Sequence, residues 1–313
     1  MLELFLFLLF IGLFIYGMFL FGKGLFNFSG ESLNKWLFTI TGAPWKGLII
    51  GTLVTAVLNS SSAVMVITIG LISARKLTFP QAIGIILGTN IGTTVDAEII
   101  TLDIDSLIIP MAVVGGVFAL IKGKILRSSG FILLGLAAVF GAMWGFEYLA
   151  SSLLEMEFVN QFILTIGNNS FYAVLAGIVI AGTIQSSSAT VGITMGFLTS
   201  GIMELDTAVA IMLGANIGTC VDVLFAGYVS RVKESLLTAW AHVWINILGV
   251  AVFFPFIGWL TDLGQLLSSH PDVQLAHVSV IFNILVSLLF LPFTNQFAKF
   301  ILKIHDRKKN PSL

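Results

Sequence analysis

Charged side chains are scarce in this sequence. They make up 10% of its 313 residues, whereas soluble domains carry about 25%. Apolar residues reach 57% and the mean hydropathy is +1.03, so polar residues are too few to cover a water-soluble globule. The formal net charge of −1 argues against a nucleic-acid partner, which would require a basic face. The sequence therefore predicts an integral membrane protein whose main partner is membrane lipid.

Cysteine is nearly absent as well. Cys220 is the one thiol of the chain, which excludes an internal disulfide. The N-terminal segment is apolar over about 20 residues, but it lacks a basic start and a small-residue cleavage site. We expect it to be a retained transmembrane helix and not a signal peptide.

An internal repeat is the clearest pattern in the sequence. Residues 51–96 align without a gap to residues 177–222, and 18 of the 46 aligned positions are identical. The strongest blocks are LNSSSAV against IQSSSAT and LGTNIGTTVD against LGANIGTCVD. Chance similarity of apolar helices would not repeat three polar motifs at one offset, so we infer a duplicated structural unit.

The hydrophobic pattern predicts an all-α membrane protein with two kinds of segment. Two pairs of short apolar arms, 44–58 with 63–76 and 171–184 with 189–203, surround the polar tips. An arm of about 15 residues rises about 22 Å, less than the hydrocarbon thickness of about 30 Å. Each pair is therefore predicted to be a re-entrant hairpin. Two full spans in place of a hairpin would also return the chain to the side from which it started, so only the length of the arms favours the hairpin. The expected spanning helices are 2–22, 79–101, 104–121, 127–150, 207–229, 236–260 and 274–300.

The distribution of charge predicts the orientation of the chain. When the chain is threaded through these spans, all 15 basic residues fall on one side, and the acidic loop residues, such as Asp103, Glu155 and Asp206, fall on the other. The positive-inside rule makes the basic side cytoplasmic, with the N-terminus outside and the C-terminus inside. Each repeat holds three spans, which is an odd number, so the second copy starts from the opposite face of the membrane. The two copies are therefore expected to be inverted.

The expected domain organisation follows from the repeat. Residues 1–126 form the first unit, with its hairpin at 44–76 and a broken helix at 79–101. Residues 127–260 form the inverted second unit, with its hairpin at 171–203 and a broken helix at 207–229. Residues 261–313 supply a C-terminal transmembrane helix and a basic cytoplasmic tail.

The hairpin tips carry the chemistry of an anion site. In both tips, three serines begin the second arm, where free backbone N–H groups and the helix dipole favour negative charge. Tight packing between small residues is the alternative explanation. We expect the two tips to meet and to bind an oxyanion through Ser60, Ser61, Ser62, Ser186, Ser187 and Ser188.

A second repeated motif has the chemistry of a cation site. Its paired glycines are expected to unwind a helix and free carbonyl oxygens that suit Na⁺, although close helix packing is also plausible. An aspartate follows each motif, and a buried carboxylate within a membrane is costly unless a cation balances it. The candidates are Asn90, Thr93, Thr94 and Asp96 in one copy and Asn216, Thr219 and Asp222 in the other.

Basic residues are missing from the region where the two motifs would meet. A bound anion there would have no Lys or Arg partner, so co-bound cations and helix N-termini would have to balance its charge. Anion binding would then depend on cation binding, which is the basis of symport.

The doubled serine tips, preceded by Asn59 and Gln185, and the paired NIGT motifs resemble the sodium/phosphate cotransporter family over about residues 2–300. The resemblance implies inverted repeats, re-entrant hairpins, Na⁺ as the coupling ion and inorganic phosphate as the substrate. It implies that the six tip serines bind phosphate and adds Asn59 and Gln185 to the candidate Na⁺ ligands. Asn59 stands where the family usually has glutamine, and its shorter side chain changes the reach of that amide.

We therefore expect a cell-membrane transporter that carries phosphate with Na⁺ by alternating access, without a cofactor, a transition metal or enzymatic activity. A related transporter for another oxyanion, or one coupled to protons, remains an alternative. A serine hydrolase that uses a tip serine with His242 is less consistent with six near-equivalent serines. A channel is a further alternative, in which uptake against a gradient should fail. A homo-oligomer is compatible with the sequence.

Overall fold

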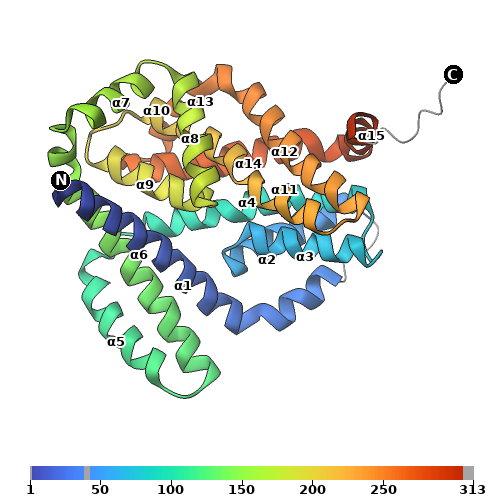
Figure 1. Cartoon of the computed structure of the whole chain (residues 1–313), viewed down its shortest axis with the longest axis horizontal. Helices are drawn as coiled ribbons and strands as arrows, with labels where there is room; N and C mark the ends of the chain where they lie inside the picture. Colours follow the sequence, from blue (N-terminus) through green and yellow to red (C-terminus); the bar gives the residue numbers. More distant parts are fainter. Residues whose placement is uncertain (1, 39–42, 306–313) are drawn as a thin grey trace.

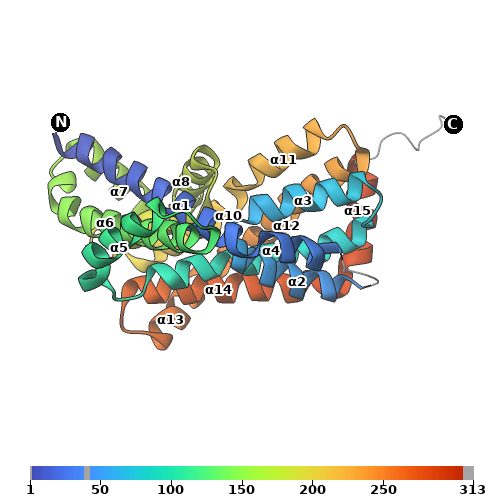
Figure 2. The same cartoon turned by 90° about the horizontal axis from the view of Figure 1, so that it is seen from below.

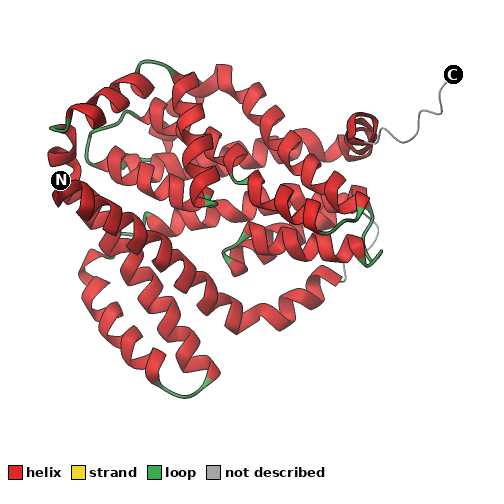
Figure 3. Ribbon diagram, viewed as in Figure 1, coloured by secondary structure: helices red, strands yellow, loops and turns green. Residues whose placement is uncertain are grey.

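The computed structural model describes the backbone of residues 2–38 and 43–305, and the side chains of residues 2–28 and 43–305. The predicted tail residues Arg307, Lys308 and Lys309 lie outside the described residues. Figure 3 shows that the described part of the chain is helical and contains no strand, which confirms the all-α prediction.

The first half of the chain contains three long helices, three shorter ones and a 3-10 turn (Figure 1). Its helices are α1 (Leu2–Phe38), α2 (Pro44–Leu58), α3 (Ser61–Ser73), α4 (Phe79–Ile100), the short 3-10 turn η1 (Asp105–Leu107), α5 (Ile108–Leu120) and α6 (Lys124–Leu154). The second half contains α7 (Glu157–Gly167), α8 (Ser170–Ile184), α9 (Ser187–Thr199), α10 (Leu205–Gly218), α11 (Cys220–Val229) and α12 (Lys233–Phe253). The chain continues through η2 (Phe254–Phe256), α13 (Ile257–Leu267), α14 (Pro271–Phe290), η3 (Leu291–Phe293) and α15 (Thr294–His305).

Long apolar helices confirm the membrane class. Within the described residues, six helical segments are long and apolar enough to cross a bilayer: Leu2–Phe28, Phe79–Ile100, Lys124–Leu154, Leu205–Val229, Lys233–Leu267 and Pro271–His305. The expected span at 104–121 is a shorter apolar helix, Asp105–Leu120, which packs along α6. Helix α7 was not expected, because the polar residues Glu157, Asn160 and Gln161 interrupt its apolar sequence; it meets α8 at a bend of 119°.

The two hairpins have the predicted arms. Helices α2 and α8 have 15 residues each, and α3 and α9 have 13, so no single arm reaches across about 30 Å of hydrocarbon. Figure 1 shows the turn between α2 and α3 and the turn between α8 and α9 near the middle of the molecule. Figure 2 shows α4 and α14 running along the molecule, with α3 of the first hairpin and α8 of the second above them.

The prediction of a broken helix at 79–101 in the first unit is wrong, because α4 runs unbroken from Phe79 to Ile100. A Cβ atom at Gly88 would collide with the carbonyl oxygen of Leu48, so the glycines allow α2 to pack tightly against α4. The hydroxyl of Thr93 donates to the carbonyl oxygen of Thr89 at 2.8 Å and stays within the helix. The packing alternative therefore accounts for the glycines of this motif, and α4 has no break there that would free carbonyl oxygens for a cation.

The second unit repeats this packing and also has the break. A Cβ atom at Gly214 would collide with the carbonyl oxygen of Val174, as one at Gly88 would with that of Leu48. Both residues of the second contact follow their counterparts in the first by 126 positions. Helix α10 ends at Gly218 and α11 begins at Cys220, so the expected interruption is present here. The inverted orientation of the two units stays a prediction.

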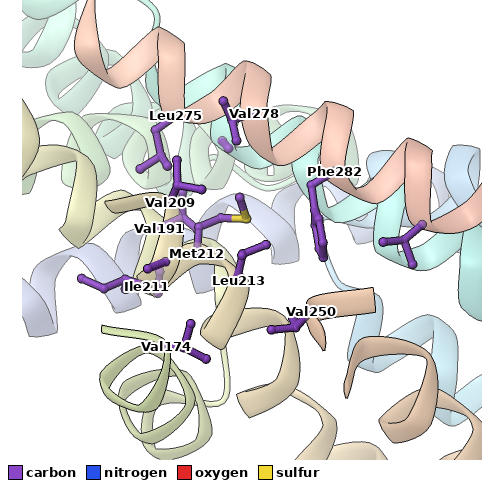
Figure 4. Close-up of a cluster of buried hydrophobic side chains, with 14 of the residues drawn as sticks. Val174, Val191, Val209, Ile211, Met212, Leu213, Val250, Leu275, Val278 and Phe282 are labelled. Carbon is purple, nitrogen blue, oxygen red and sulfur yellow. The ribbon is translucent and has the colours of Figure 1, made fainter. Parts of the chain in front are cut away.

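The core lies around α10, whose apolar side chains pack against helices that precede it and follow it in the second half of the sequence. Figure 4 shows Val209, Met212 and Leu213 of α10 between Leu275 and Phe282 of α14 and Val174 of α8. All of these residues are buried. This packing holds α8, α9 and α14 around α10 and so fixes the position of the second hairpin tip.

Candidate functional site

Each hairpin turns at a residue in the left-handed region of backbone conformation. Asn59 has φ 51° and ψ 37°, and Gln185 has φ 57° and ψ 33°. This conformation costs roughly 1–2 kcal/mol for a residue with a Cβ atom, and asparagine tolerates it better than most. The amide nitrogen of Asn59 is buried without a hydrogen-bond partner among the described residues, whereas Gln185 is exposed. The two amides that precede the serines therefore lie in different surroundings.

The first serine of each triplet caps the helix that follows. The Oγ of Ser60 accepts a hydrogen bond from the backbone N–H of Ala63 at 3.1 Å, and Ser186 makes the same bond to Ala189 at 3.0 Å. Ser, Thr and Asp are preferred at this position because they satisfy a free N–H group of the first turn. These two hydroxyls thus hold the turns in shape.

The third serine of each triplet contacts the aspartate of the other repeat. Ser188 donates a hydrogen bond to Oδ2 of Asp96 at 2.6 Å. Ser62 donates to Oδ2 of Asp222. The two pairs are related by the repeat offset of 126 residues. Each hairpin tip is therefore linked to a helix of the opposite unit: α9 to α4, and α3 to α11.

The second serines are the free hydroxyls of the tips. Ser61 and Ser187 make no hydrogen bond within the part of the chain that the structure describes. Both are partly exposed, and both stand at the first position of their helices, α3 and α9. A hydroxyl at a helix N-terminus is placed to donate to an anion.

The two tips line one cavity of about 250 Å³. No lysine or arginine is among its described lining residues, as the sequence predicted. The lining residues are Asn59, the serines 60–62, Gln185, the serines 186–188, Ala189, Thr93, Asp96, Thr219 and three α1 residues, Ile15, Met18 and Phe19. The contribution of α1 was not foreseen, because its apolar sequence carries no sign of a binding site.

The two aspartates differ in their surroundings. Asp96 lines the cavity and is 4% exposed, and its Oδ1 has no hydrogen-bond partner among the described residues. Asp222 lies outside the cavity and is partly exposed, and its Oδ1 accepts the N–H of Val223 at 2.6 Å. A buried carboxylate oxygen without a donor is unfavourable unless a cation or a proton occupies the position beside it. Asp96 is therefore the better placed of the two to bind a cation.

Four of the candidate Na⁺ ligands lie away from the cavity. The hydroxyl of Thr94 donates to the carbonyl oxygen of Ile91 at 2.7 Å. The side-chain amide of Asn216 donates to the carbonyl oxygen of Met212 at 2.9 Å. Asp222 binds Ser62 as described above. The structure brings Asn59, Gln185, Thr93, Thr219 and Asp96 to the cavity and leaves Asn90, Thr94, Asn216 and Asp222 outside it.

Asn90 belongs to a separate buried polar cluster. Its amide donates to Oδ1 of Asn246 at 3.1 Å, and its Oδ1 lies 3.3 Å from Nε2 of His242. Asn246 also donates to the sulfur of Cys220 at 3.4 Å. An amide one turn after a histidine in an apolar helix was the available sequence signal for this cluster. His242 contacts Asn90 and not a tip serine, so the geometry does not favour the serine-hydrolase alternative.

The chain matches known proteins over most of its length. The family model described as Na⁺/Pi-cotransporter matches residues 13–149 and again residues 143–269. "Uncharacterized protein YqeW" of Bacillus subtilis is 37% identical over 279 residues, which are 89% of this chain and 90% of that protein. No solved structure matches the chain.

Two further relatives have names that refer to phosphate. "Putative inorganic phosphate export protein YjbB" of Salmonella typhimurium is 24% identical over 80% of this chain, which spans 46% of that protein. "Sodium-dependent phosphate transport protein 2C" of Homo sapiens is 37% identical over 87 residues, or 27% of this chain and 14% of that protein.

Proposed function

The chain belongs to the Na⁺/Pi-cotransporter family, and from this premise we propose that it carries inorganic phosphate across the cell membrane together with Na⁺. The observation that supports the coupling most directly is the composition of the cavity between the hairpin tips. Its described lining residues include hydroxyl groups and one buried carboxylate, Asp96, but no basic side chain. Phosphate would bring negative charge to a place that already holds a carboxylate, so cations must accompany it.

The donors for phosphate are the free hydroxyls of Ser61 and Ser187 and the backbone N–H groups at the starts of α3 and α9. Ser60 and Ser186 shape the turns, and Ser62 and Ser188 bind the aspartates. All six serines thus contribute to the phosphate site, but by three different routes. The two hairpins present the same groups from different units, which suits a tetrahedral anion.

The cation site centres on Asp96, whose Oδ1 lacks a donor. Thr93, Thr219, Asn59 and Gln185 line the same cavity and supply further oxygen atoms. Oxygen ligands suit a hard cation such as Na⁺. A proton on Asp96 would also balance the charge, and sulfate or another oxyanion would meet the same hydroxyls; these are the alternatives that an assay must separate.

Transport by alternating access is supported by the crossed serine–aspartate contacts. Each hairpin tip is held by the other unit, so both contacts must change when the cavity opens to the opposite side. The two contacts are unequal in this structure, since Asp96 faces the cavity and Asp222 does not. We propose that their roles exchange in the other state. The direction of net flux then depends on the gradients, and inward Na⁺ movement contributes about 2.3 kcal/mol per charge per 100 mV.

Phosphate flux into proteoliposomes tests the function. We expect uptake of radiolabelled phosphate to require an inward Na⁺ gradient and to fail when K⁺ replaces Na⁺. Uptake against a phosphate gradient would exclude a channel. Uptake driven equally by a proton gradient without Na⁺, or a preference for sulfate over phosphate, would replace this proposal with one of its alternatives.

The free serines provide the matched variants for this assay. Loss of a hydrogen bond to a charged ligand costs about 1.5–3 kcal/mol, so Ser61→Ala and Ser187→Ala should each reduce apparent phosphate affinity about tenfold or more. Thr165→Ala is the control, because Thr165 is exposed and bonds only within α7. Unchanged affinity in both serine variants would mean that the tips serve packing alone.

A further inference from the structure

Four buried side chains form a polar network beside the cavity-lining residues of α4 and α10. They are Asn90 of α4, Cys220 of α11, and His242 and Asn246 of α12, and all four are buried. None of them lines the cavity between the hairpin tips. Polar side chains inside a membrane protein are costly and usually serve a function, so the position of this network in the fold indicates what it does.

Asn246 is the centre of the network. Its Oδ1 accepts a hydrogen bond from the side-chain amide of Asn90 at 3.1 Å. Its own amide nitrogen donates to the sulfur of Cys220 at 3.4 Å and to the carbonyl oxygen of His242, one turn earlier in α12, at 2.9 Å. Both ends of the Asn246 amide are therefore engaged, and the side chain joins α4 of the first unit to α11 of the second.

His242 holds the other end of the Asn90 amide. Because the nitrogen of Asn90 donates to Asn246, its Oδ1 is the atom that faces Nε2 of His242, at 3.3 Å, and accepts the proton of that nitrogen. Asn90 is thus bound at both ends by α12. Its repeat counterpart, Asn216, donates instead to Met212 of its own helix. The contact with α12 is therefore specific to the first copy of the motif.

The network meets the second unit where its long helix is interrupted. Helix α10 ends at Gly218 and α11 begins at Cys220, which leaves Thr219, a residue of the cavity wall, between them. At an interruption the backbone ladder alone no longer fixes one helical segment against the other, so contacts from neighbouring helices contribute. Asn246 supplies such a contact, and α12 packs against both α10 and α11.

The first unit does not require this support. Helix α4 is continuous, and Thr94, the counterpart of Cys220, makes its hydrogen bond within its own helix. Asn90 and Asp96 are six residues apart on this continuous helix, or about 9 Å along its axis. Asn90 is therefore a fixed point relative to Asp96, and the network holds the start of α11 to that point.

From these contacts we propose that Asn246 is a positioning residue for the cation site. By binding Asn90 and Cys220, it fixes the start of α11 against α4. The position of Thr219 relative to Asp96 follows from that contact. The inference rests on the proposed function, from which these two residues are taken as cation ligands. Asn246 itself does not touch the cation, so its loss should weaken Na⁺ binding without removing a ligand.

Na⁺ titration of phosphate uptake in proteoliposomes tests this role. Leucine resembles asparagine in size but makes no hydrogen bond, so Asn246→Leu should raise the Na⁺ concentration for half-maximal uptake about fivefold or more. The phosphate KM at saturating Na⁺ should stay within about twofold. Thr238→Val is the matched control, because Thr238 is also buried on α12 and donates to Glu234 of the same helix.

Three results of the titration would overturn the positioning role. They are an unchanged Na⁺ dependence in Asn246→Leu, an equal rise in Thr238→Val, and a phosphate KM that rises as much as the Na⁺ requirement. The last two would show a general loss of packing and no specific effect on the cation site.

Substitutions of Cys220 test the same contact from its other side, and they carry the test if Asn246→Leu does not fold. Cys220→Ser keeps an acceptor for the amide of Asn246 and should keep the Na⁺ dependence of the unsubstituted protein. Cys220→Ala removes the acceptor and should reproduce the rise. The double variant Asn246→Leu/Cys220→Ala should be no worse than Asn246→Leu alone, because both changes remove one contact. Additive rises would show that the two residues act separately and would overturn the proposal.

The reactivity of Cys220 provides a readout that does not depend on transport. Cys220 is the single thiol of the chain and is buried, so alkylation of the purified protein by N-ethylmaleimide reports on this position alone. We expect Asn246→Leu to react about tenfold faster than the unsubstituted protein, and Thr238→Val to react at the unsubstituted rate. Equal rates for all three would show that Asn246 does not hold the start of α11. Faster alkylation of Asn246→Leu, together with Na⁺-independent uptake by the unsubstituted protein, would refute the cation role through the proposed function while the contact itself stands.

Discussion

At the residue scale, three serines with the same side chain have three different surroundings. Ser186 caps a helix, Ser188 binds an aspartate of the other unit, and Ser187 is left free to meet a ligand. The same division holds for Ser60, Ser62 and Ser61 in the first hairpin. Position along the first turn of the helix therefore decides what each hydroxyl does. The consequences of substitution should differ in the same way.

The capping serine should affect stability before it affects binding. Replacing an N-cap serine by alanine typically costs about 1 kcal/mol, so Ser186→Ala should lower the thermal unfolding midpoint measured in detergent. Ser187→Ala should leave that midpoint unchanged while it weakens phosphate uptake. Equal midpoints for the two variants would show that the cap contributes nothing to stability.

The two aspartates should differ in their effect on Na⁺ dependence. Asp96 has a buried oxygen without a donor and faces the cavity, whereas both oxygens of Asp222 accept hydrogen bonds. We expect Asp96→Asn to raise the Na⁺ concentration for half-maximal phosphate uptake at least tenfold. Asp222→Asn, its pseudo-symmetric control, should raise it less. The reverse order would place the cation on the Asp222 side.

At the element scale, close packing of the first hairpin arms against α4 and α10 sets the position of the tips. Glycines bring α2 against α4 and α8 against α10, with equivalent residues in contact in both units. Gly51 contacts Ile85 as Gly177 contacts Ile211, for example. Such close approach lets backbones pack without hydrophobic driving force from water. It also explains why α4 stays unbroken despite the glycines in its sequence.

One methyl group at this interface should disturb the hairpin. A Cβ atom at Gly214 would collide with the carbonyl oxygen of Val174, and overpacking of this kind costs roughly 1–3 kcal/mol. We expect Gly214→Ala to reduce the monodisperse fraction on gel filtration. Gly70→Ala in α3 is the control, because the space around Gly70 is open. The same yield for both variants would contradict the packing argument.

At the scale of the whole molecule, the two units contribute to one site. The tip of each hairpin binds an aspartate of the other unit, and the cavity takes residues from both. The shared cavity makes the orientation of the units important for the proposed alternating-access mechanism, which requires the site to be reachable from either side of the membrane. The positive-inside rule gives the expected orientation.

Labelling from one side of the membrane tests that orientation. In a Cys220→Ala background, Lys122→Cys should react with a membrane-impermeant maleimide only in inverted vesicles. Glu155→Cys should react only in intact cells, because the charge pattern places it outside. Both positions are exposed, so a lack of reaction reports the side and not burial. Reaction of both from the same side would overturn the inverted arrangement of the units.

The sequence by itself determined the class of the molecule and the chemistry of its tips. Too few charged residues to cover a soluble surface required a membrane, and the repeated serines and aspartates identified the groups to be brought together. Local patterns also placed the four hairpin arms, since short apolar runs and N-cap serines act through neighbouring residues.

Only the tertiary structure decided which of the repeated residues share the cavity. The sequence motifs around Asp96 and Asp222 are nearly identical, yet Asp96 faces the cavity and Asp222 does not. The motifs around Asn90 and Asn216 are also nearly identical, and neither of these amides faces the cavity. These differences arise from contacts between elements distant in the sequence: Ser188 with Asp96, and His242 and Asn246 with Asn90. A repeat in the sequence fixes which groups correspond, but the partners that surround each copy decide its role.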